Sequence, residues 1–269
     1  MKKLLLLEYS KWKKNSVIGI LLIMFVLMLP LVIFIGKEFD NVPPPLPSSD
    51  VFFEFPSMWG YLGYAGSWLA FFCLGLISVF IVVNEVSYKT LRQNIITGML
   101  RKEYFLGKFL SVLVIAISAT LYYTIIGLII GFIHTKGATI GDAFDNSWAI
   151  PRFFLMCMGY MTFGLFCGFL FRRSGVSVLF YLIYIMMLEP AVKWLVHFRM
   201  FENNSINFYP SNVFEDLMPF PLYHFADLIP KKDLDFDFLL PYGTASMAAV
   251  VWIVILAGLA YRGIVSRDV

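Results

Sequence analysis

The sequence predicts an all-α membrane protein with six transmembrane helices. Of its 269 residues, 59% are hydrophobic and 14% are charged, and the mean hydropathy is +0.77. Soluble domains carry roughly 25% charged residues, so the composition argues against a water-soluble domain. Several apolar stretches reach the roughly 20 residues that a helix needs to cross a bilayer.

Residues 1–15 are expected to form an interfacial helix. Leu5, Tyr9 and Trp12 fall on one helical face, and lysines lie close by. Such lysines reach toward anionic head groups while the apolar face enters the membrane surface. A signal peptide is the weaker interpretation, because the run of four leucines is short and no small-residue cleavage site follows.

The predicted spans belong to a single membrane domain that covers the whole chain. They are residues 17–36, 58–83, 109–133, 153–171, 176–195 and 243–261. Pro30 falls within the first span, where neighbouring helices can satisfy the carbonyl that a proline leaves unpaired. Gly164 and Gly168 form a GxxxG pattern in the fourth span, which permits the close approach of another helix.

The largest predicted extramembrane piece is residues 198–240. It is rich in Phe, Tyr, Pro and acidic residues, and about forty residues are too few for a good independent core. We expect this extracytoplasmic loop to fold back onto the membrane surface or to cap the spans.

The orientation follows from the distribution of lysine and arginine. Four segments hold 14 of the 21 basic residues but only four of the 18 acidic residues. They are the N-terminal helix, residues 84–108, the turn at Arg172 and Arg173, and the C-terminal segment. Because cytoplasmic loops carry an excess of lysine and arginine, these segments and both termini are expected on the cytoplasmic side.

Residues 84–108 form a charged segment between the second and third spans. Its apolar residues recur with the spacing of one helical face, and they are Leu91, Ile95, Ile96, Met99 and Leu100. Glu85 precedes Lys89 by four residues, which is the favourable order for a helical ion pair, and Gly98 permits a break. A loop that only sets topology needs no apolar stripe. The pattern therefore favours docking, either to lipid head groups or to a groove in a protein partner.

Nothing in the sequence predicts catalysis, a resident cofactor, a metal site or nucleic-acid binding. The phosphate-binding pattern GxxxxGK[ST] is missing, as are HExxH, GxSxG and paired carboxylates. Cys73, Cys157 and Cys167 lie in apolar runs without metal-ligand spacing, and we expect them to be buried small hydrophobic residues.

Glu189 is the candidate polar site within a span. An ionisable side chain inside the membrane marks a functional site by default. The alternative is a structural role near the outer end of the fifth span, where Glu189 meets the distortion at Pro190 and pairs with Lys193. Lys193 and Trp194 resemble interfacial anchors, which favours the structural role.

The pattern E-x4-T-L-R-x5-G-x2-R-x5-G-K resembles the cytoplasmic loop of ABC-2-type transporter permeases. In this chain it consists of Glu85, Thr90, Leu91, Arg92, Gly98, Arg101, Gly107 and Lys108. Six spans, a basic N-terminal helix and a short basic C-terminus are similar to that family as well. The chain differs from the common pattern at Tyr88-Lys89-Thr90, where many members have Lys-Gly-Thr, and near Gly98, where many have proline.

The resemblance implies the permease subunit of a bacterial ABC exporter in the cell (inner) membrane. Residues 84–108 would then contain a cytoplasmic coupling helix that sits in a groove of a separate ATPase subunit, which binds ATP and magnesium. The implied coupling residues are Glu85, Lys89, Thr90, Leu91, Arg92, Asn94, Ile95, Gly98 and Arg101. The other implied partners are a second permease subunit, identical or paralogous, and membrane lipid.

Two other classes of protein stay open at this point. A membrane scaffold or assembly factor would bind a cytoplasmic partner through residues 85–108 without transport. An intramembrane enzyme is disfavoured, because no span carries paired His, Asp or Glu residues. For a transporter, the scarcity of charges in the spans favours a lipid-like, peptide or otherwise amphipathic substrate.

Overall fold

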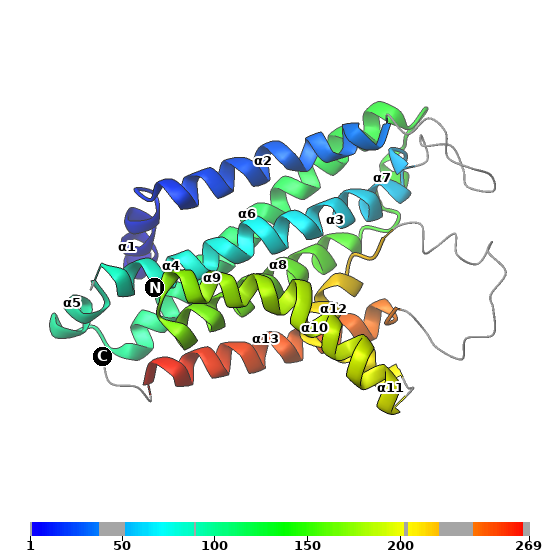
Figure 1. The fold of residues 1–269 in the computed structure, drawn as a ribbon. Helices are drawn as coiled ribbons and strands as arrows, with labels where there is room; N and C mark the ends of the chain where they lie inside the picture. Colours follow the sequence, from blue (N-terminus) through cyan, green and yellow to red (C-terminus); the bar gives the residue numbers. More distant parts are fainter. Residues whose placement is uncertain (1, 38–51, 89, 202–203, 221–238, 266–269) are drawn as a thin grey trace.

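Long helices run side by side in the computed structural model, and the described residues contain no strand (Figure 1). The structure describes residues 2–37, 52–88, 90–201, 204–220 and 239–265. The predicted all-α architecture is therefore confirmed for these residues, while residues 202–203 and 221–238 of the predicted extracytoplasmic loop lie outside them.

The described chain forms α-helices with short π-helical and 3₁₀ segments between them. In its first half these are α1 (Lys2–Trp12), α2 (Ser16–Lys37), α3 (Ser57–Leu69), the π-helical η2 (Ala70–Gly75), α4 (Leu76–Ser87), α5 (Thr90–Ile96) and α6 (Arg101–His134). In its second half they are α7 (Ile140–Phe144), α8 (Ala149–Phe171), α9 (Ser174–Ile183), the π-helical η3 (Tyr184–Leu188), α10 (Glu189–Ala191), the π-helical η4 (Val192–His197), α11 (Phe198–Phe201), the 3₁₀ segment η5 (Asn204–Phe208), α12 (Pro210–Asp216) and α13 (Tyr242–Val265).

Five helical stretches of the described chain are long and apolar enough to cross a membrane. They are Ser57–Ser87, Arg101–His134, Ile140–Phe171, Ser174–Met200 and Tyr242–Val265. A sixth candidate is a bent pair, in which Leu4–Trp12 and Ser16–Leu31 meet at 89°. Asn15 forms the corner, since its Oδ1 accepts hydrogen bonds from the N–H groups of Val17 (3.0 Å) and Ile18 (3.2 Å) at the start of α2.

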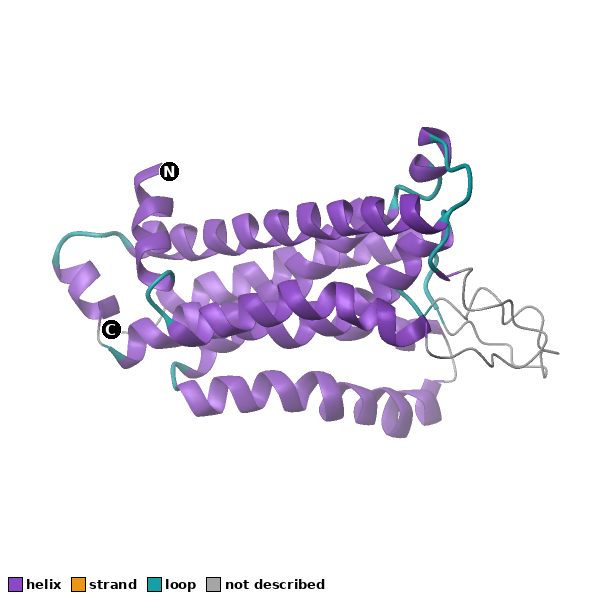
Figure 2. Ribbon diagram, turned by 90° about the horizontal axis from the view of Figure 1, so that it is seen from above, coloured by secondary structure: helices purple, strands orange, loops and turns teal. Residues whose placement is uncertain are grey.

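The bundle has two distinct ends (Figures 1 and 2). One end, which we call the α5 end, holds α1, α5 and the end of α13. The opposite end, called the α12 end, holds α7, α10 and α12. Described basic residues from four segments that are far apart in the sequence lie at the α5 end, and they include Lys11, Lys108, Arg172 and Arg262.

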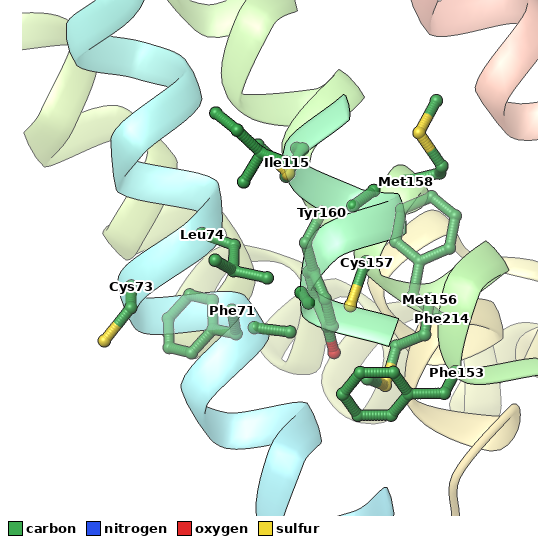
Figure 3. Packing of buried hydrophobic residues seen from close by; sticks show 14 of the residues in the cluster. Phe71, Cys73, Leu74, Ile115, Phe153, Met156, Cys157, Met158, Tyr160 and Phe214 are labelled. Carbon is green, nitrogen blue, oxygen red and sulfur yellow. The ribbon is translucent and has the colours of Figure 1, made fainter. Parts of the chain in front are cut away.

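Helix α8 lies at the centre of the bundle and packs against α4, α6, α9 and α13. Tyr123 of α6 stacks on Phe153 of α8, with ring centroids 4.1 Å apart. Tyr160 of α8 contacts Phe71 of η2 and Phe214 of α12 (Figure 3). Because lipid is as apolar as these side chains, close van der Waals packing is what holds such helices together. The three cysteines are free and buried, as predicted.

Gly164 lets α8 approach the η2–α4 helix closely. A Cβ atom at this position would overlap the Ser78 hydroxyl and the backbone carbonyl oxygen of Gly75. The backbone of η2 cannot move aside without disturbing the helix, so glycine is required. The GxxxG pattern that contains Gly164 therefore serves packing within this chain.

Replacing Gly164 by alanine is expected to loosen the contact between α8 and η2. Overpacking in a close-packed interior costs roughly 1–3 kcal/mol, so Gly164→Ala should lower the melting temperature of the detergent-purified protein by several degrees. Gly258→Ala on α13 is the control, since a new Cβ there meets no described atom within 4 Å. Equal melting temperatures for the two variants would show that Gly164 imposes no packing constraint.

Candidate functional site

Helix α5 is joined to the end of α4 by side-chain hydrogen bonds. The Thr90 hydroxyl donates to the Glu85 carbonyl oxygen at 3.1 Å, and Asn94 Nδ2 donates to Glu85 Oε2 at 3.4 Å. Three of the predicted coupling residues therefore contact one another. These bonds fix the short helix relative to the span that precedes it.

Gly98 ends α5 and sets the direction of the chain into α6. Its φ of 99° lies in the left-handed region, which glycine adopts without steric cost. The Gly98 N–H donates to the Ile95 carbonyl and the Met99 N–H to the Asn94 carbonyl, both at 3.0 Å. These are the two bonds of a Schellman motif. The predicted break at Gly98 is confirmed.

Lys108 lies at the centre of a buried ion cluster that joins three helices. Its Nζ contacts Glu8 Oε2 of α1 at 2.5 Å and also contacts Glu85 Oε1 of α4. Lys11 of α1 lies 3.0 Å from a carboxylate oxygen of each glutamate. Lys108, Glu8 and Glu85 are only 1%, 3% and 6% exposed. We call these four residues the Lys108 cluster.

The Lys108 cluster balances two positive against two negative charges. A buried charge without a partner carries a large desolvation cost, so each member needs the others to stay in place. The Lys108 Nζ also lies 5.2 Å from the centre of the Tyr104 ring, a distance at which a cation is attracted to the ring face. The cluster therefore ties α1, α4 and α6 together directly beside α5.

The predicted apolar stripe of residues 84–108 divides into two sets. Ile95 and Met99 are partly buried and pack against the bundle core. Ile96 and Leu100 are 77% and 64% exposed. Ile96 is the last residue of α5, which projects beyond the ends of α4 and α6 (Figure 1), and Leu100 is the residue before α6. The two are therefore exposed apolar side chains on either side of the Gly98 turn.

Arg101 and Arg172 bind the C-terminal turn of α13. Arg101 Nη1 donates to the carbonyl oxygens of Ile264 (3.3 Å) and Val265 (2.7 Å). Arg172 Nη2 donates to the carbonyl oxygen of Gly263 (3.0 Å). Guanidinium groups satisfy the last carbonyls of a helix and complement their partial negative charge. Arg101 thus has a structural role, and its predicted role in coupling stays a prediction.

Several predicted coupling residues cannot be placed in this site. Lys89 lies outside the described residues, and so do the side chains of Leu91 and Arg92. Their predicted roles, including the ion pair between Lys89 and Glu85, stay predictions. Sequence reasoning missed Glu8 as a partner in the site, and the one signal for it was an isolated acid among the N-terminal lysines.

Glu189 binds the first turn of α12. Its Oε2 accepts the Ser211 N–H at 3.0 Å and its Oε1 accepts the Asn212 N–H at 2.8 Å. A carboxylate at a helix N-terminus complements the unpaired N–H groups there. Lys193 Nζ donates to Asn212 Oδ1. Glu189 and Lys193 attract each other electrostatically but make no direct ion pair within 4 Å. Each side chain instead binds a partner in α12 that the local sequence does not reveal.

Pro190 lies between two π-helical segments. It belongs to α10, with η3 before it and η4 after it. A proline inside a helix removes one backbone hydrogen bond and crowds the preceding turn, and π-helical turns are a common local adjustment. The predicted distortion at Pro190 is present, and it turns Lys193 toward α12.

Asp216 is a buried acid that sequence reasoning missed. It is 4% exposed, and its Oδ2 accepts hydrogen bonds from the Leu240 N–H (3.1 Å) and Asn212 Nδ2 (3.0 Å). Burial raises the pKa of Asp216 to about 7, although the Leu240 hydrogen bond and the charge of Lys193 oppose this rise. Asp216 therefore changes its charge near neutral pH.

The described residues offer no site for a metal ion. They contain no group of three or more His, Cys, Asp or Glu side chains that could hold one. Lysine ammonium groups bind the carboxylates at the α5 end, and backbone and amide donors bind those at the α12 end.

Comparison with known protein families gives a match over much of the chain. The family model described as ABC-2 family transporter protein matches residues 4–188, which is more than half of the sequence. No curated protein matches the chain. The matched region extends from α1 through η3, so it includes α5 and the Lys108 cluster.

Removing the charge of Lys108 is expected to destabilise the α5 end. Lys108→Met leaves Glu8 and Glu85 buried without their main partner, a change that costs roughly 3–5 kcal/mol in comparable cases. Thermal unfolding in detergent should show a clear drop in melting temperature, whereas Lys102→Met, at an exposed lysine of the same helix, should show none. The variant that also carries Glu8→Gln and Glu85→Gln should recover part of the loss. A stable Lys108→Met protein would refute the role assigned to the cluster.

The raised pKa of Asp216 predicts a pH-dependent stability. Its ordinary pKa is 3.8, against about 7 in the folded protein, so between these values the folded form holds a proton that the unfolded chain releases. The proton bound to folded Asp216 therefore adds to the free energy of unfolding at low pH. This addition is lost as the pH rises through 7. The groups facing Asp216 are Glu215 on the same helix, Glu189 of α10 and Lys193 of η4.

We expect the melting temperature of the wild-type protein to fall between pH 5 and pH 8, and Asp216→Asn to flatten this fall. Asp145→Asn, an exposed acid at the same end of the bundle, should keep the wild-type slope. The assigned pKa is contradicted if Asp216→Asn melts with an unchanged pH dependence.

Proposed function

The chain belongs to the ABC-2 transporter family, and on this basis we propose that it is the permease subunit of an ATP-binding cassette exporter. The family match and the apolar spans support a transport role in a membrane. Hydrolysis takes place in a separate ATPase subunit, which holds ATP and magnesium. The direction of transport is taken from the family resemblance.

The observation that carries the proposal is a pair of exposed apolar side chains at the end of α5 and just after it. Ile96, the last residue of α5, and Leu100, the residue before α6, are 77% and 64% exposed, and α5 lies beyond the ends of the long helices (Figure 1). Apolar side chains of the spans face lipid, but α5 projects from the end of the bundle. A groove of an ATPase subunit would cover these side chains in the way that a hydrophobic groove accepts an amphipathic helix.

Movement of α5 reaches the spans through Glu85. This residue accepts hydrogen bonds from Thr90 and Asn94 and also contacts Lys108 of α6. When two ATPase subunits close around nucleotide, a shift of α5 therefore acts on α4 and α6 together. Packed helices transmit such shifts as rigid bodies, which couples ATP hydrolysis to rearrangement of the substrate path.

Docking of an ATPase on α5 also implies the orientation and the subunits of the assembled transporter. An ATPase at the α5 end places this end, with both termini, in the cytoplasm of a bacterium, and the excess of lysine and arginine at the α5 end fits that side of the cell membrane. A second permease subunit, identical or paralogous, completes the path. Apolar side chains on the bundle surface, such as Leu121 and Val254, are 59% and 65% exposed and face lipid or this second subunit.

A charge at the exposed apolar end of α5 is expected to break ATPase binding. Burying an unpaired carboxylate at an interface costs several kcal/mol, so Ile96→Asp should reduce the ATPase that co-purifies with the permease by about tenfold or more. Arg92→Glu should act in the same direction. Quantitative immunoblotting of the purified complex provides the measurement.

Ile140→Asp is the matched control, because Ile140 is 73% exposed at the opposite end of the bundle. It should leave ATPase binding unchanged. Ile96→Asp protein that still binds and stimulates the ATPase would overturn the assignment of α5. A co-purifying partner without the GxxxxGK[ST] pattern would favour a membrane scaffold instead.

A further inference from the structure

A polar cavity of about 360 Å³ opens at the α12 end, between α3, α8, α10 and α12. The charged residues that line it within the described chain are Glu189, Lys193, Glu215 and Asp216. Glu189, Lys193 and Asp216 hold α12 and Leu240 in place through hydrogen bonds. Glu215 is an exposed residue that lines both cavities, and its carboxylate makes no hydrogen bond or ion pair to the described residues. Three acids and one lysine give the cavity a negative balance.

An apolar cavity of about 210 Å³ adjoins the polar one. The two share the lining residues Tyr160, Ile185, Pro190 and Glu215. The apolar cavity continues along membrane-spanning helices to side chains that include Trp68 and Met186, which are 52% and 59% exposed. Both side chains belong to candidate spans and are exposed on the bundle surface, so this cavity opens sideways from the bundle.

Tyr160 lies where the two cavities meet, and it could bind a ligand there. Its side chain is 4% exposed, yet its hydroxyl makes no hydrogen bond to the part of the chain that the structure describes. The ring lies between Phe71 and Phe214 (Figure 3), and the residue lines both cavities. The described residues offer this hydroxyl no partner, so it can donate a hydrogen bond to a ligand in the cavities that Tyr160 lines.

The helix backbone is irregular around both cavities. The π-helical η2 contributes Phe71, η3 contributes Ile185, and η4 contributes Lys193. Single π-helical turns within longer helices occur frequently at functional sites, where they redirect side chains. Three such segments bracket the same space.

We propose that the two cavities together bind a membrane lipid whose head group carries a primary ammonium group. The ammonium group lies between the Glu215 carboxylate and the Tyr160 hydroxyl, and the lipid phosphate lies toward Lys193. The first part of an acyl chain follows Trp68 and Met186 into the bilayer. A cavity of about 360 Å³ has the size of a small-molecule site, which suits a head group and excludes a folded polypeptide.

This inference goes beyond the proposed transport function, because lipid binding requires neither the ATPase nor nucleotide. A failure of lipid binding would leave the α5 assignment intact, and a failure of ATPase docking would leave the lipid site intact. The two are therefore tested by separate experiments on the same full-length protein.

The test is native mass spectrometry of the detergent-purified chain titrated with phosphatidylethanolamine or with its N-acetyl derivative. The two lipids have the same chains and phosphate, and they differ in the charge of the amine. We expect phosphatidylethanolamine to bind about tenfold more tightly, as the loss of one charge-assisted hydrogen bond predicts. Dodecylamine, a free amphiphile with the same cation, should compete more weakly because it lacks the phosphate that meets Lys193.

Two variants locate the site. Glu215→Gln should remove the preference for the free amine, and Tyr160→Phe should weaken phosphatidylethanolamine binding about threefold, as loss of a neutral hydrogen bond predicts. Asp145→Asn, which removes an exposed acid outside both cavities, should change neither. Because the Glu215 carboxylate holds no described residue in place, its variant should melt like the wild type. Equal binding of the two lipids, or an unchanged preference in Glu215→Gln, would overturn the proposal.

Discussion

The buried pairing of Lys108 with Glu8 and Glu85 is the interaction on which the α5 end depends. Charges this deeply buried tolerate little displacement, because losing a partner exposes each to the full cost of desolvation. The three residues belong to α6, α1 and α4, so these three helices are held in one arrangement. Glu85 also accepts a hydrogen bond from Asn94 of α5. A single carboxylate thus connects the helix that projects from the bundle with the helices that cross the membrane.

The two ends of the bundle use buried charge differently. At the α5 end the charges pair with one another and make a rigid joint. At the α12 end Glu189 and Lys193 act on α12, while Glu215 remains directed into a cavity. The first arrangement suits the transmission of force and the second suits the recognition of a ligand. Between them, α8 fills the core largely with aromatic and small residues.

Local sequence patterns predicted the features that depend on local chemistry. Apolar length predicted the membrane-spanning helices, and Gly98 predicted the end of α5 because few other residues adopt its backbone conformation. Patterns of neighbouring residues did not predict the side-chain partners that come from distant parts of the sequence. Glu189 and Lys193 have the spacing of a helical ion pair, yet both bind α12 about twenty residues later in the chain. Glu8 and Lys108 are separated by 100 residues, and a single sequence contains no signal that they meet.

Photo-crosslinking from α5 would identify the molecule that covers this helix. A photoreactive residue placed at Ile96 in the intact membrane, and separately at Ile140, would report what lies against each end of the bundle. If the ATPase docks at the α5 end, position 96 forms an adduct with an ATP-binding subunit and position 140 does not. An adduct from position 96 that contains only lipid, or equal labelling of the ATPase from both positions, would contradict it.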